Sequence, residues 1–261
     1  MDKSDKYRPI GLFDSGVGGL TVYKELKTLL SSEDYIYLGD TLNMPYGEKS
    51  ENELTEIARK IFDFFAAKHV KAVVMACNTT SAICYDKLKD DYDFKIYPVI
   101  QSVSKIISNL TVNRIGVFAA PATVNSHAYS KYIVGKDVFE VACPEWVKIV
   151  ENNEILTQDS IQKVKSKIDE MMEFRPEKII LGCTHYPYLA DIIGQFYKKE
   201  NLINPAKYFA EFIKEDLSKC DLLGVNGGGY ENIYVSAEPV KFMLSAEKFY
   251  EISKLPKLLK L

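Results

Sequence analysis

Two short stretches of the chain decide its fold: VVMACNTT at residues 73–80 and IILGCTH at residues 179–185. In each stretch a compact apolar run ends at one cysteine, and small or polar residues follow it. An apolar run of this length is typical of a buried strand in a parallel sheet. Ligands of such sheets bind beyond the carboxyl ends of the strands. The pattern therefore predicts that Cys77 and Cys183 both face a ligand site.

The rest of the chain alternates apolar runs with amphipathic stretches, which is the signature of βαβ units. Strands are predicted at residues 10–13, 35–38, 72–76, 96–100, 115–119, 138–142 and 179–181. Helices are predicted at residues 20–30, 50–68, 80–89, 102–110 and 161–172. Ser50 and Glu53 fit a capping box at the start of the second of these helices. Right-handed crossovers between parallel strands would give doubly wound sheets, so the predicted fold class is α/β.

Composition favours a small-molecule partner. The chain has 261 residues, of which 47% are hydrophobic and 26% charged, and its formal net charge is −3. These values are ordinary for a globular protein and give no basic footprint for nucleic acid or an acidic membrane. No apolar signal region opens the sequence, and no uncharged run is long enough to span a bilayer, so we expect a cytoplasmic protein. Five cysteines without a C-x-x-C pair indicate free thiols and not a disulfide framework.

The residues around the two cysteines favour thiol chemistry. Cys77 comes directly before Asn78 and Thr79, which are good residues for a helix start, and a thiol at that end of a helix has a lowered pKa. Cys183 is predicted to lie in a loop, where the nearby His185 could transfer a proton or stabilise a thiolate. The alternative is inert: a small cysteine at a strand end often only packs, and a lone histidine is more often structural.

Two acids also follow predicted strands. Asp14 opens the segment DSGVGG at residues 14–19, whose backbone amides could wrap an anionic group. Asp40 follows YIYLG at residues 35–39 and is a second carboxylate at the carboxyl end of a predicted strand. The segment lacks the glycine spacing of a dinucleotide site and the Lys-Ser/Thr of a P-loop, which disfavours nucleotide binding. The spacing of histidines and cysteines predicts no metal site. Cys84 and Cys220 are read as packing or surface thiols, and His69 and His127 as structural residues. Cys143 ends the run at 138–142 but precedes Pro144, which offers no N–H for an anion, so it ranks below Cys77 and Cys183.

Four motifs taken together resemble glutamate racemase, in the aspartate/glutamate racemase superfamily. They are DSGVGGLTV at 14–22, GD at 39–40 with PYG at 45–47, ACNTTS at 76–81 and GCTHYP at 182–187. The resemblance implies cofactor-independent interconversion of L- and D-glutamate, which supplies D-glutamate for bacterial peptidoglycan, usually by a homodimer. It implies two pseudo-symmetric, doubly wound α/β domains with the active site in the cleft between them. With joints at Pro98 and Pro205, we expect one domain of residues 1–97 and 206–261 and another of residues 98–205.

The resemblance also implies roles for single residues. Cys77 and Cys183 match the two catalytic thiols, with Cys77 acting on D-glutamate and Cys183 on L-glutamate. Residues that match substrate-contacting positions are Asp14, Ser15, Tyr46, Gly47, Asn78, Thr79, Thr184 and His185. Glu151, and not Glu145, matches the auxiliary glutamate. Asp14, Glu151 and His185 are candidates for assisting the thiols, and Asp14 or Asp40 for balancing the substrate ammonium.

Other functions stay open at this point. An aspartate or hydantoin racemase would keep both cysteines but differ in the side-chain pocket. A ligand-binding protein with two α/β lobes would use the cysteines only for packing. A thiol redox protein is weakened by the missing C-x-x-C. The chain also departs from the resemblance at Asn204-Pro205, where many members have an aspartate, and its tail beyond Gly227 is hard to align.

Overall fold

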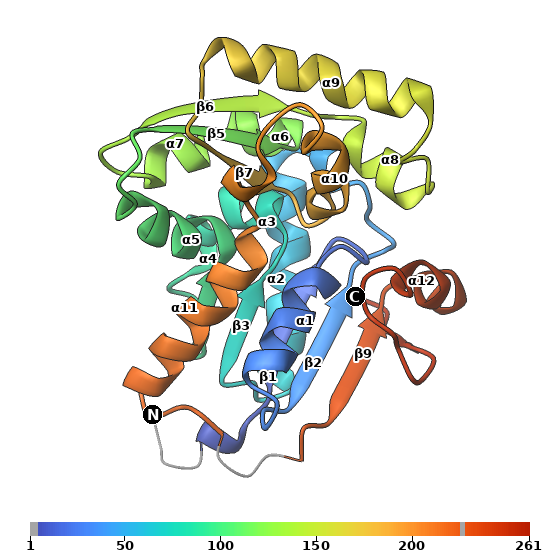
Figure 1. Cartoon of the computed structure of the whole chain (residues 1–261). Coiled ribbons are helices and arrows are strands. Elements are labelled where there is room, and N and C mark those ends of the chain that lie inside the picture. Colours follow the sequence, from blue (N-terminus) through green and yellow to red (C-terminus); the bar gives the residue numbers. More distant parts are fainter. Residues whose placement is uncertain (1–4, 225–227) are drawn as a thin grey trace. The chain divides into compact units, whose positions relative to one another are not determined.

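The computed structural model describes residues 5–224 and 228–261 and forms two compact units (Figure 1). Unit 1 comprises Met1–Val99 and Ala206–Leu261, and unit 2 comprises Ile100–Pro205. Each unit contains one parallel sheet with helices packed against it. The predicted α/β class with two parallel sheets is therefore confirmed.

Unit 1 is built on a six-stranded sheet in the order β10-β9-β2-β1-β3-β4. All of its strand pairs are parallel. The strands are β1 Ile10–Asp14, β2 Tyr35–Gly39, β3 Ala72–Met75, β4 Lys95–Pro98, β9 Glu231–Val235 and β10 Lys257–Leu258. Every residue of β1, β2 and β3 is buried. These central strands read as continuous apolar runs because both faces of the sheet are covered.

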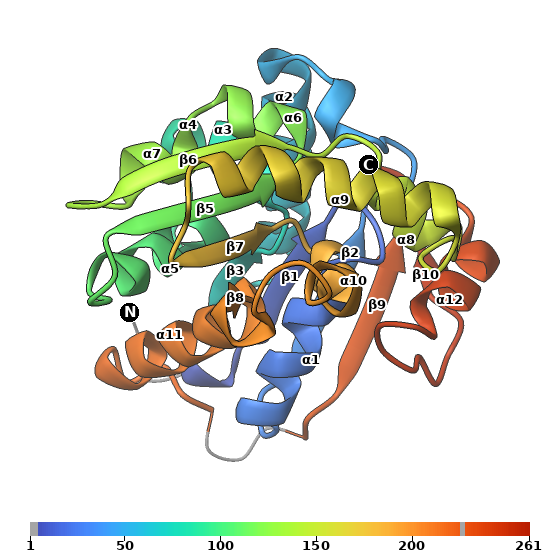
Figure 2. The same ribbon diagram turned by 45° about the horizontal axis from the view of Figure 1, so that its top comes forward.

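The helices of unit 1 lie on both faces of this sheet, with α1 and α11 on one side and α2 on the other (Figures 1 and 2). They are η1 Asp5–Tyr7, α1 Leu20–Leu29, η2 Tyr46–Glu48, α2 Glu51–Ala67, α3 Asn78–Ile83, α4 Tyr85–Leu88, α11 Pro205–Lys219 and α12 Pro239–Ala246. Helix α2 begins with the predicted capping box: Ser50 accepts from the Glu53 backbone N–H, and the Glu53 side chain accepts from that of Ser50. The buried stripe of α2 packs into the core of unit 1.

Unit 2 is built on a four-stranded sheet in the order β6-β5-β7-β8. Its strands are β5 Arg114–Ala119, β6 Asp137–Ala142, β7 Lys178–Gly182 and β8 Leu202–Ile203. Its helices are α5 Val99–Ser108, α6 Pro121–Asn125, α7 Ala128–Tyr132, α8 Trp146–Glu151, α9 Gln158–Glu173, η3 Tyr186–Leu189, α10 Ala190–Ile193 and η4 Lys199–Asn201. Helix α9 lies so close to the sheet that a Cβ atom at Gly116 would be 2.4 Å from the Met171 sulfur.

The two sheets repeat one topology. The first four strands of unit 1 have the order β2-β1-β3-β4, and those of unit 2 have the order β6-β5-β7-β8. In both units the first strand lies between the second and the third, and the fourth is next to the third. Cys77 follows the third strand of unit 1, and Cys183 follows the third strand of unit 2. The repeated strand-cysteine pattern therefore corresponds to a repeated position in the fold.

Two predicted elements are wrong in part. The strand expected at 96–100 ends at Pro98, and Val99 and Ile100 instead begin α5. Both residues are buried, so the apolar run continues from a strand into the buried face of a helix, and hydrophobicity alone does not reveal the change. The helix expected at 80–89 is two short helices, α3 and α4, that meet at Cys84.

Candidate active site

Asp14 ends β1, and the glycine-rich loop after it folds back onto its own carboxylate. Oδ2 of Asp14 accepts hydrogen bonds from the backbone N–H groups of Gly16 at 3.3 Å and Gly19 at 2.9 Å. A Cβ atom at residue 19 would lie 2.4 Å from the Asp14 Cβ, so only glycine fits there. We expected these loop amides to be available for an anionic ligand. Two of them bind Asp14 instead and hold this buried acid at the carboxyl end of the sheet.

Cys77 lies where β3 leads into α3. It takes the N-cap position with extended backbone, and its carbonyl oxygen accepts from the Ser81 N–H at 3.0 Å and the Thr80 hydroxyl at 3.2 Å. Asn78 and Thr79 are the first residues of the helix and are buried, as is Cys77 at 6% exposure. The structure therefore places the thiol at the amino-terminal end of a helix, the position that the sequence predicts.

Two buried tyrosines lie near both the acids and the thiol of unit 1. Burial raises the pKa of Tyr37 well above its usual value, and the charges of Asp14 and Cys77 add to this effect. Burial likewise raises the pKa of Tyr46, with further contributions from Asp40, Cys77 and Asp14. The hydroxyl of Tyr37 also donates to the Gly16 carbonyl oxygen at 2.7 Å and so supports the loop that follows Asp14.

Asp40 is the centre of a hydrogen-bond network within unit 1. Its carboxylate accepts from Tyr46 at 2.6 Å, from Ser236 at 2.6 Å and from the Asn43 amide at 2.9 and 3.0 Å. The side chain is fully buried. Because both carboxylate oxygens accept from protein donors, this geometry suits a residue that holds Tyr46 and its neighbour Gly47 in place. It suits the other predicted role, balancing a substrate ammonium, less well.

In unit 2, Cys183 directly follows β7 and contacts a histidine–glutamate pair. The Cys183 sulfur lies 3.9 Å from Nδ1 of His185, and Nε2 of His185 lies 3.1 Å from a carboxylate oxygen of Glu151. Glu151 is the last residue of α8, and its side chain is 30% exposed, whereas that of His185 is 4% exposed. Thr184, between the thiol and the imidazole in sequence, is buried at 9% exposure. The structure thus brings together three of the predicted residues.

The imidazole of His185 favours its protonated form. Burial alone would lower the pKa of His185, but the contacts with Cys183 and Glu151 outweigh burial and raise the pKa from 6.5 to about 10. A protonated imidazole between a sulfur and a carboxylate presents positive charge to both of these groups. This part of unit 2 therefore holds a proton on the imidazole next to the Cys183 sulfur.

An aromatic layer supports this part of unit 2. The Tyr186 hydroxyl donates to the Cys143 carbonyl oxygen at 2.8 Å, and its ring packs edge-on against Trp146 with 5.0 Å between ring centroids. Burial raises the pKa of the Cys143 thiol well above its usual value, which suits packing and not nucleophilic chemistry. Burial also raises the pKa of Cys84, to about 12. Both thiols are buried, as expected for the packing role predicted for Cys84, and Cys143 ranks below Cys77 and Cys183 as predicted.

Comparison with known proteins identifies the family. Residues 10–213 match the family model described as Asp/Glu/Hydantoin racemase. The chain belongs to this racemase family. It is 39% identical over 246 residues to the glutamate racemase of Thermoanaerobacter sp. (strain X514), covering 92% of each chain. The resemblance that the four motifs indicate is therefore confirmed, and the protein is an isomerase.

Solved structures agree with this assignment. The racemase superposes with a TM-score of 0.89 on the glutamate racemase of Francisella tularensis in complex with D-glutamate, at 32% identity over 98% of each chain. The same TM-score, identity and coverage hold for the glutamate racemase of Thermus thermophilus in complex with β-chloro-D-alanine.

Sequence reasoning missed the partners of Asp40 in this racemase. Asn43 and Ser236 both bind its carboxylate, and Ser236 is 196 positions away in the sequence. Ser236 follows β9, and β9 pairs with β2 directly beside the strand end that carries Asp40. The only available signal was the strand position of Asp40, since a polar side chain at the carboxyl end of a parallel strand attracts polar neighbours.

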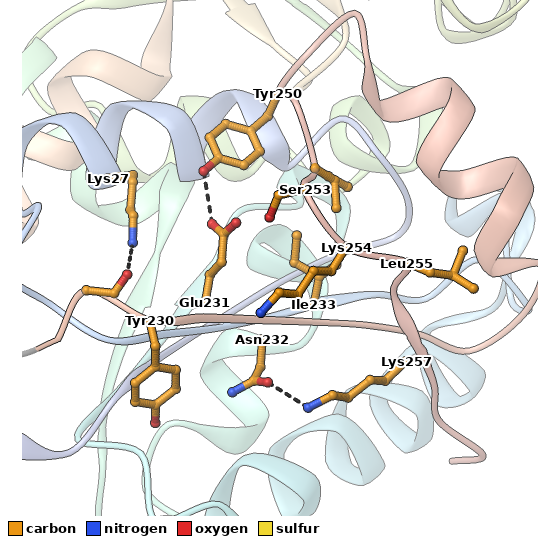
Figure 3. A pocket seen from close by; sticks show the side chains of 12 residues that line it. Lys27, Tyr230, Glu231, Asn232, Ile233, Tyr250, Ser253, Lys254, Leu255 and Lys257 are labelled. Carbon is orange, nitrogen blue, oxygen red and sulfur yellow. Dashed lines mark hydrogen bonds between the residues drawn. The ribbon is translucent and has the colours of Figure 1, made fainter.

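A separate cavity of the racemase does not involve the predicted residues. A cavity of about 370 Å³ lies beside the first residues of β9 (Figure 3). It is therefore near the amino-terminal ends of the parallel strands of unit 1. Its lining includes Lys27, Glu231 and Tyr250, and Glu231 accepts from the Tyr250 hydroxyl at 2.9 Å. Cys77 and Asp14, in contrast, lie at the carboxyl end of this sheet. The cavity is therefore not the candidate active site.

The described part of the racemase contains neither a metal-binding cluster nor a membrane-spanning helix. Within residues 5–224 and 228–261, no group of three or more His, Cys, Asp or Glu side chains could hold a metal ion. None of the helices described there combines the length and the apolar character needed to cross a bilayer.

Proposed function

We propose that this racemase interconverts L- and D-glutamate without a cofactor, with Cys77 and Cys183 as two bases that act on opposite faces of the α-carbon. The observation that carries the proposal is the repeated position of the two thiols, each within two residues of the end of the third strand of an equivalent sheet. Support for glutamate as the substrate comes from the relatives, which are named glutamate racemases, one of them in complex with D-glutamate.

The chemistry requires two groups with unequal protonation states. Racemisation removes the α-hydrogen from one face of the carbon and returns a proton to the other face, so one thiolate and one thiol are needed at the start of each turnover. After the turnover the two states are exchanged. In the proposed mechanism Cys183 is the base for L-glutamate and Cys77 the base for D-glutamate, and each cysteine is the acid in the opposite direction.

The groups of unit 1 would bind the substrate's charged ends. The α-hydrogen beside an ionised carboxylate is weakly acidic, so the site must stabilise negative charge that develops in the transition state. Asn78 and Thr79 begin α3, where backbone N–H groups and polar side chains can bind the α-carboxylate. Asp14, held in place by Gly16 and Gly19, is the acid that we assign to the substrate ammonium or to the thiol of Cys77.

The groups of unit 2 would prepare the second thiol. The His185 imidazole next to Cys183 stabilises the thiolate, and Glu151 stabilises the protonated imidazole from the other side. Thr184 contributes a hydroxyl and a backbone N–H for the substrate. Because the imidazole pKa is raised to about 10, we propose that His185 keeps its proton through the neutral pH range.

We assign the cellular role from the same relationship. D-Glutamate made by this reaction would supply bacterial peptidoglycan synthesis, and we propose a cytoplasmic homodimer as the functional form. Both points stay predictions. Analytical ultracentrifugation of the purified protein measures directly whether it is a dimer.

Circular dichroism of L-glutamate tests the function. Incubation of L-glutamate with the purified protein and no added cofactor should bring the signal to zero, since enantiomers have equal free energies in water. L-Aspartate is the matched control, and its signal should stay unchanged on the same time scale. A stable glutamate signal, or faster decay with aspartate, would refute the proposal for the substrate. Parallel use of Cys77→Ser protein excludes a contaminating racemase.

A further inference from the structure

A charged cluster of unit 1 lies outside the candidate active site. It consists of Lys95 and Tyr97 on β4 with Asp216 and Cys220 at the carboxyl end of α11, and we call it the Lys95 cluster. Nζ of Lys95 donates to Oδ2 of Asp216 at 2.5 Å and lies 2.9 Å from Sγ of Cys220. The Tyr97 hydroxyl donates to the same Asp216 oxygen at 2.7 Å. The acid therefore holds the lysine nitrogen against the sulfur.

The thiol of this cluster differs from the other thiols outside the candidate site. Cys220 is exposed, and the Lys95 side chain is 27% exposed, so a small oxidant in solution can reach the sulfur. Cys84 and Cys143 are buried, and burial raises the pKa of both. An exposed thiol that touches a cationic side chain has the surroundings of an oxidation-sensitive cysteine, whereas buried apolar surroundings make a thiol inert.

The lysine and the cysteine belong to elements whose packing holds them together. The Tyr97 ring on β4 packs edge-on against Phe212 on α11, with 6.4 Å between ring centroids. Strand β4 ends just before the chain leaves unit 1, and α11 begins where the chain returns. The Lys95 cluster therefore joins the outgoing and the returning segment within unit 1.

We propose that Lys95 and Cys220 form a covalent sulfur–nitrogen link when a peroxide oxidises the thiol. In the first step the Cys220 sulfur attacks one peroxide oxygen, the O–O bond breaks, and sulfenic acid and water form. The sulfur loses two electrons to the peroxide in this step. In the second step the lone pair of the neutral Lys95 amine attacks the sulfur, the sulfenic hydroxyl leaves, and an amine proton completes a second water. One thiol, one amine and one hydrogen peroxide thus give one sulfenamide and two waters.

The geometry suits the second step. Reacting atoms about 3–3.5 Å apart are already in near-attack geometry, and the nitrogen lies 2.9 Å from the sulfur. Burial lowers the pKa of Lys95, but the bonds to Asp216 and Cys220 outweigh burial and raise it. Only the neutral amine can attack, so the link forms through the unprotonated fraction of Lys95, whose proton passes to solvent at this 27% exposed side chain.

Peptide mapping after peroxide treatment tests the link. Trypsin does not cleave after a lysine whose amine is bonded to sulfur, so the treated full-length protein should yield residues 90–105 joined to residues 220–241. The joined peptide should be lighter by two hydrogen atoms than the sum of its reduced parts. Dithiothreitol should release it, since a thiol reduces the sulfur–nitrogen bond.

Two variants make the test specific. Lys95→Arg keeps a cation beside the thiol, but a guanidinium that stays protonated cannot attack sulfur, so dimedone should trap sulfenic acid at Cys220 without any link. Cys220→Ser should give neither product. Wild-type Cys220 that proceeds to sulfinic acid while trypsin still cleaves after Lys95 would overturn the proposal. Oxidation of Cys84 or Cys143 before Cys220 would overturn it as well.

Discussion

Cys77 in unit 1 and Cys183 in unit 2 follow equivalent strands but have different surroundings. Cys77 caps a helix, with the Asp14 carboxylate and two buried tyrosines nearby. Cys183 contacts the imidazole of His185, which Glu151 holds from the other side. A helix end can stabilise a thiolate through fixed backbone dipoles, whereas an imidazolium does so through the positive charge of a protonated side chain. In the proposed mechanism, the two proton-transfer directions should therefore depend on different residues.

Loss of either thiol should have the largest effect. Cys77→Ser and Cys183→Ser should each lower the rate of racemisation by at least about 10²-fold, because a positioned acid or base contributes about 10²–10⁴-fold. Chiral chromatography of glutamate measures both directions. Cys220→Ser is the matched control and should keep the parental rate, since Cys220 belongs to the Lys95 cluster. If either variant racemised glutamate as fast as the parent, that cysteine would not be one of the two catalytic bases.

Loss of the imidazole should separate the two directions. His185→Gln removes the cation next to Cys183, so exchange of the α-hydrogen of L-glutamate in deuterium oxide should fall by about 10²-fold. Exchange from D-glutamate should fall less, because Cys77 keeps its helix end and Asp14. Glu151→Gln keeps the imidazole and should give a smaller loss with the same preference. Equal losses for both enantiomers would show that His185 serves both thiols.

Stability should depend on pH through unit 2. The His185 pKa is raised from 6.5 to about 10, so folding favours its protonated form. The stability from this group is complete below about pH 6.5 and is lost as the pH rises through about 10. The difference in unfolding free energy between the parent and His185→Gln should therefore shrink over that range. Urea unfolding, followed by the fluorescence of Trp146, the one tryptophan in the sequence, measures it. A difference that grows with pH would contradict the assigned proton.

The Asp40 network should give the smallest effect on catalysis. Asp40→Asn leaves Tyr46, Ser236 and Asn43 facing an amide, so the KM for glutamate should rise more than kcat falls. Hydrogen bonds to a charged group contribute about 1.5–3 kcal/mol, and the free energy of unfolding should fall by about that much. Ser236→Ala removes a single donor and should have a smaller effect. A fall in kcat at unchanged KM would instead favour contact between Asp40 and the substrate.

Some strands and site residues can be predicted from the sequence, and others cannot. Strands β3 and β7 are predictable because both faces of a central parallel strand are covered, which makes the run apolar throughout. Strand β9 begins with Glu231 and Asn232, which are only partly buried, so its composition does not indicate a strand. The positions of Cys77 and Cys183 at strand ends follow from local pattern. The contact between Ser236 and Asp40 does not, because pairing between distant segments leaves no local signal.

Placement of deuterium tests the two-base claim most directly. L-Glutamate incubated with the enzyme in deuterium oxide, and stopped at low conversion, should give D-glutamate that carries α-deuterium while the remaining L-glutamate keeps its hydrogen. This follows because one thiol removes the hydrogen and the other delivers a proton that has exchanged with solvent. Deuterium that appears equally in both enantiomers from the start, or D-glutamate that retains the original hydrogen, would contradict the account.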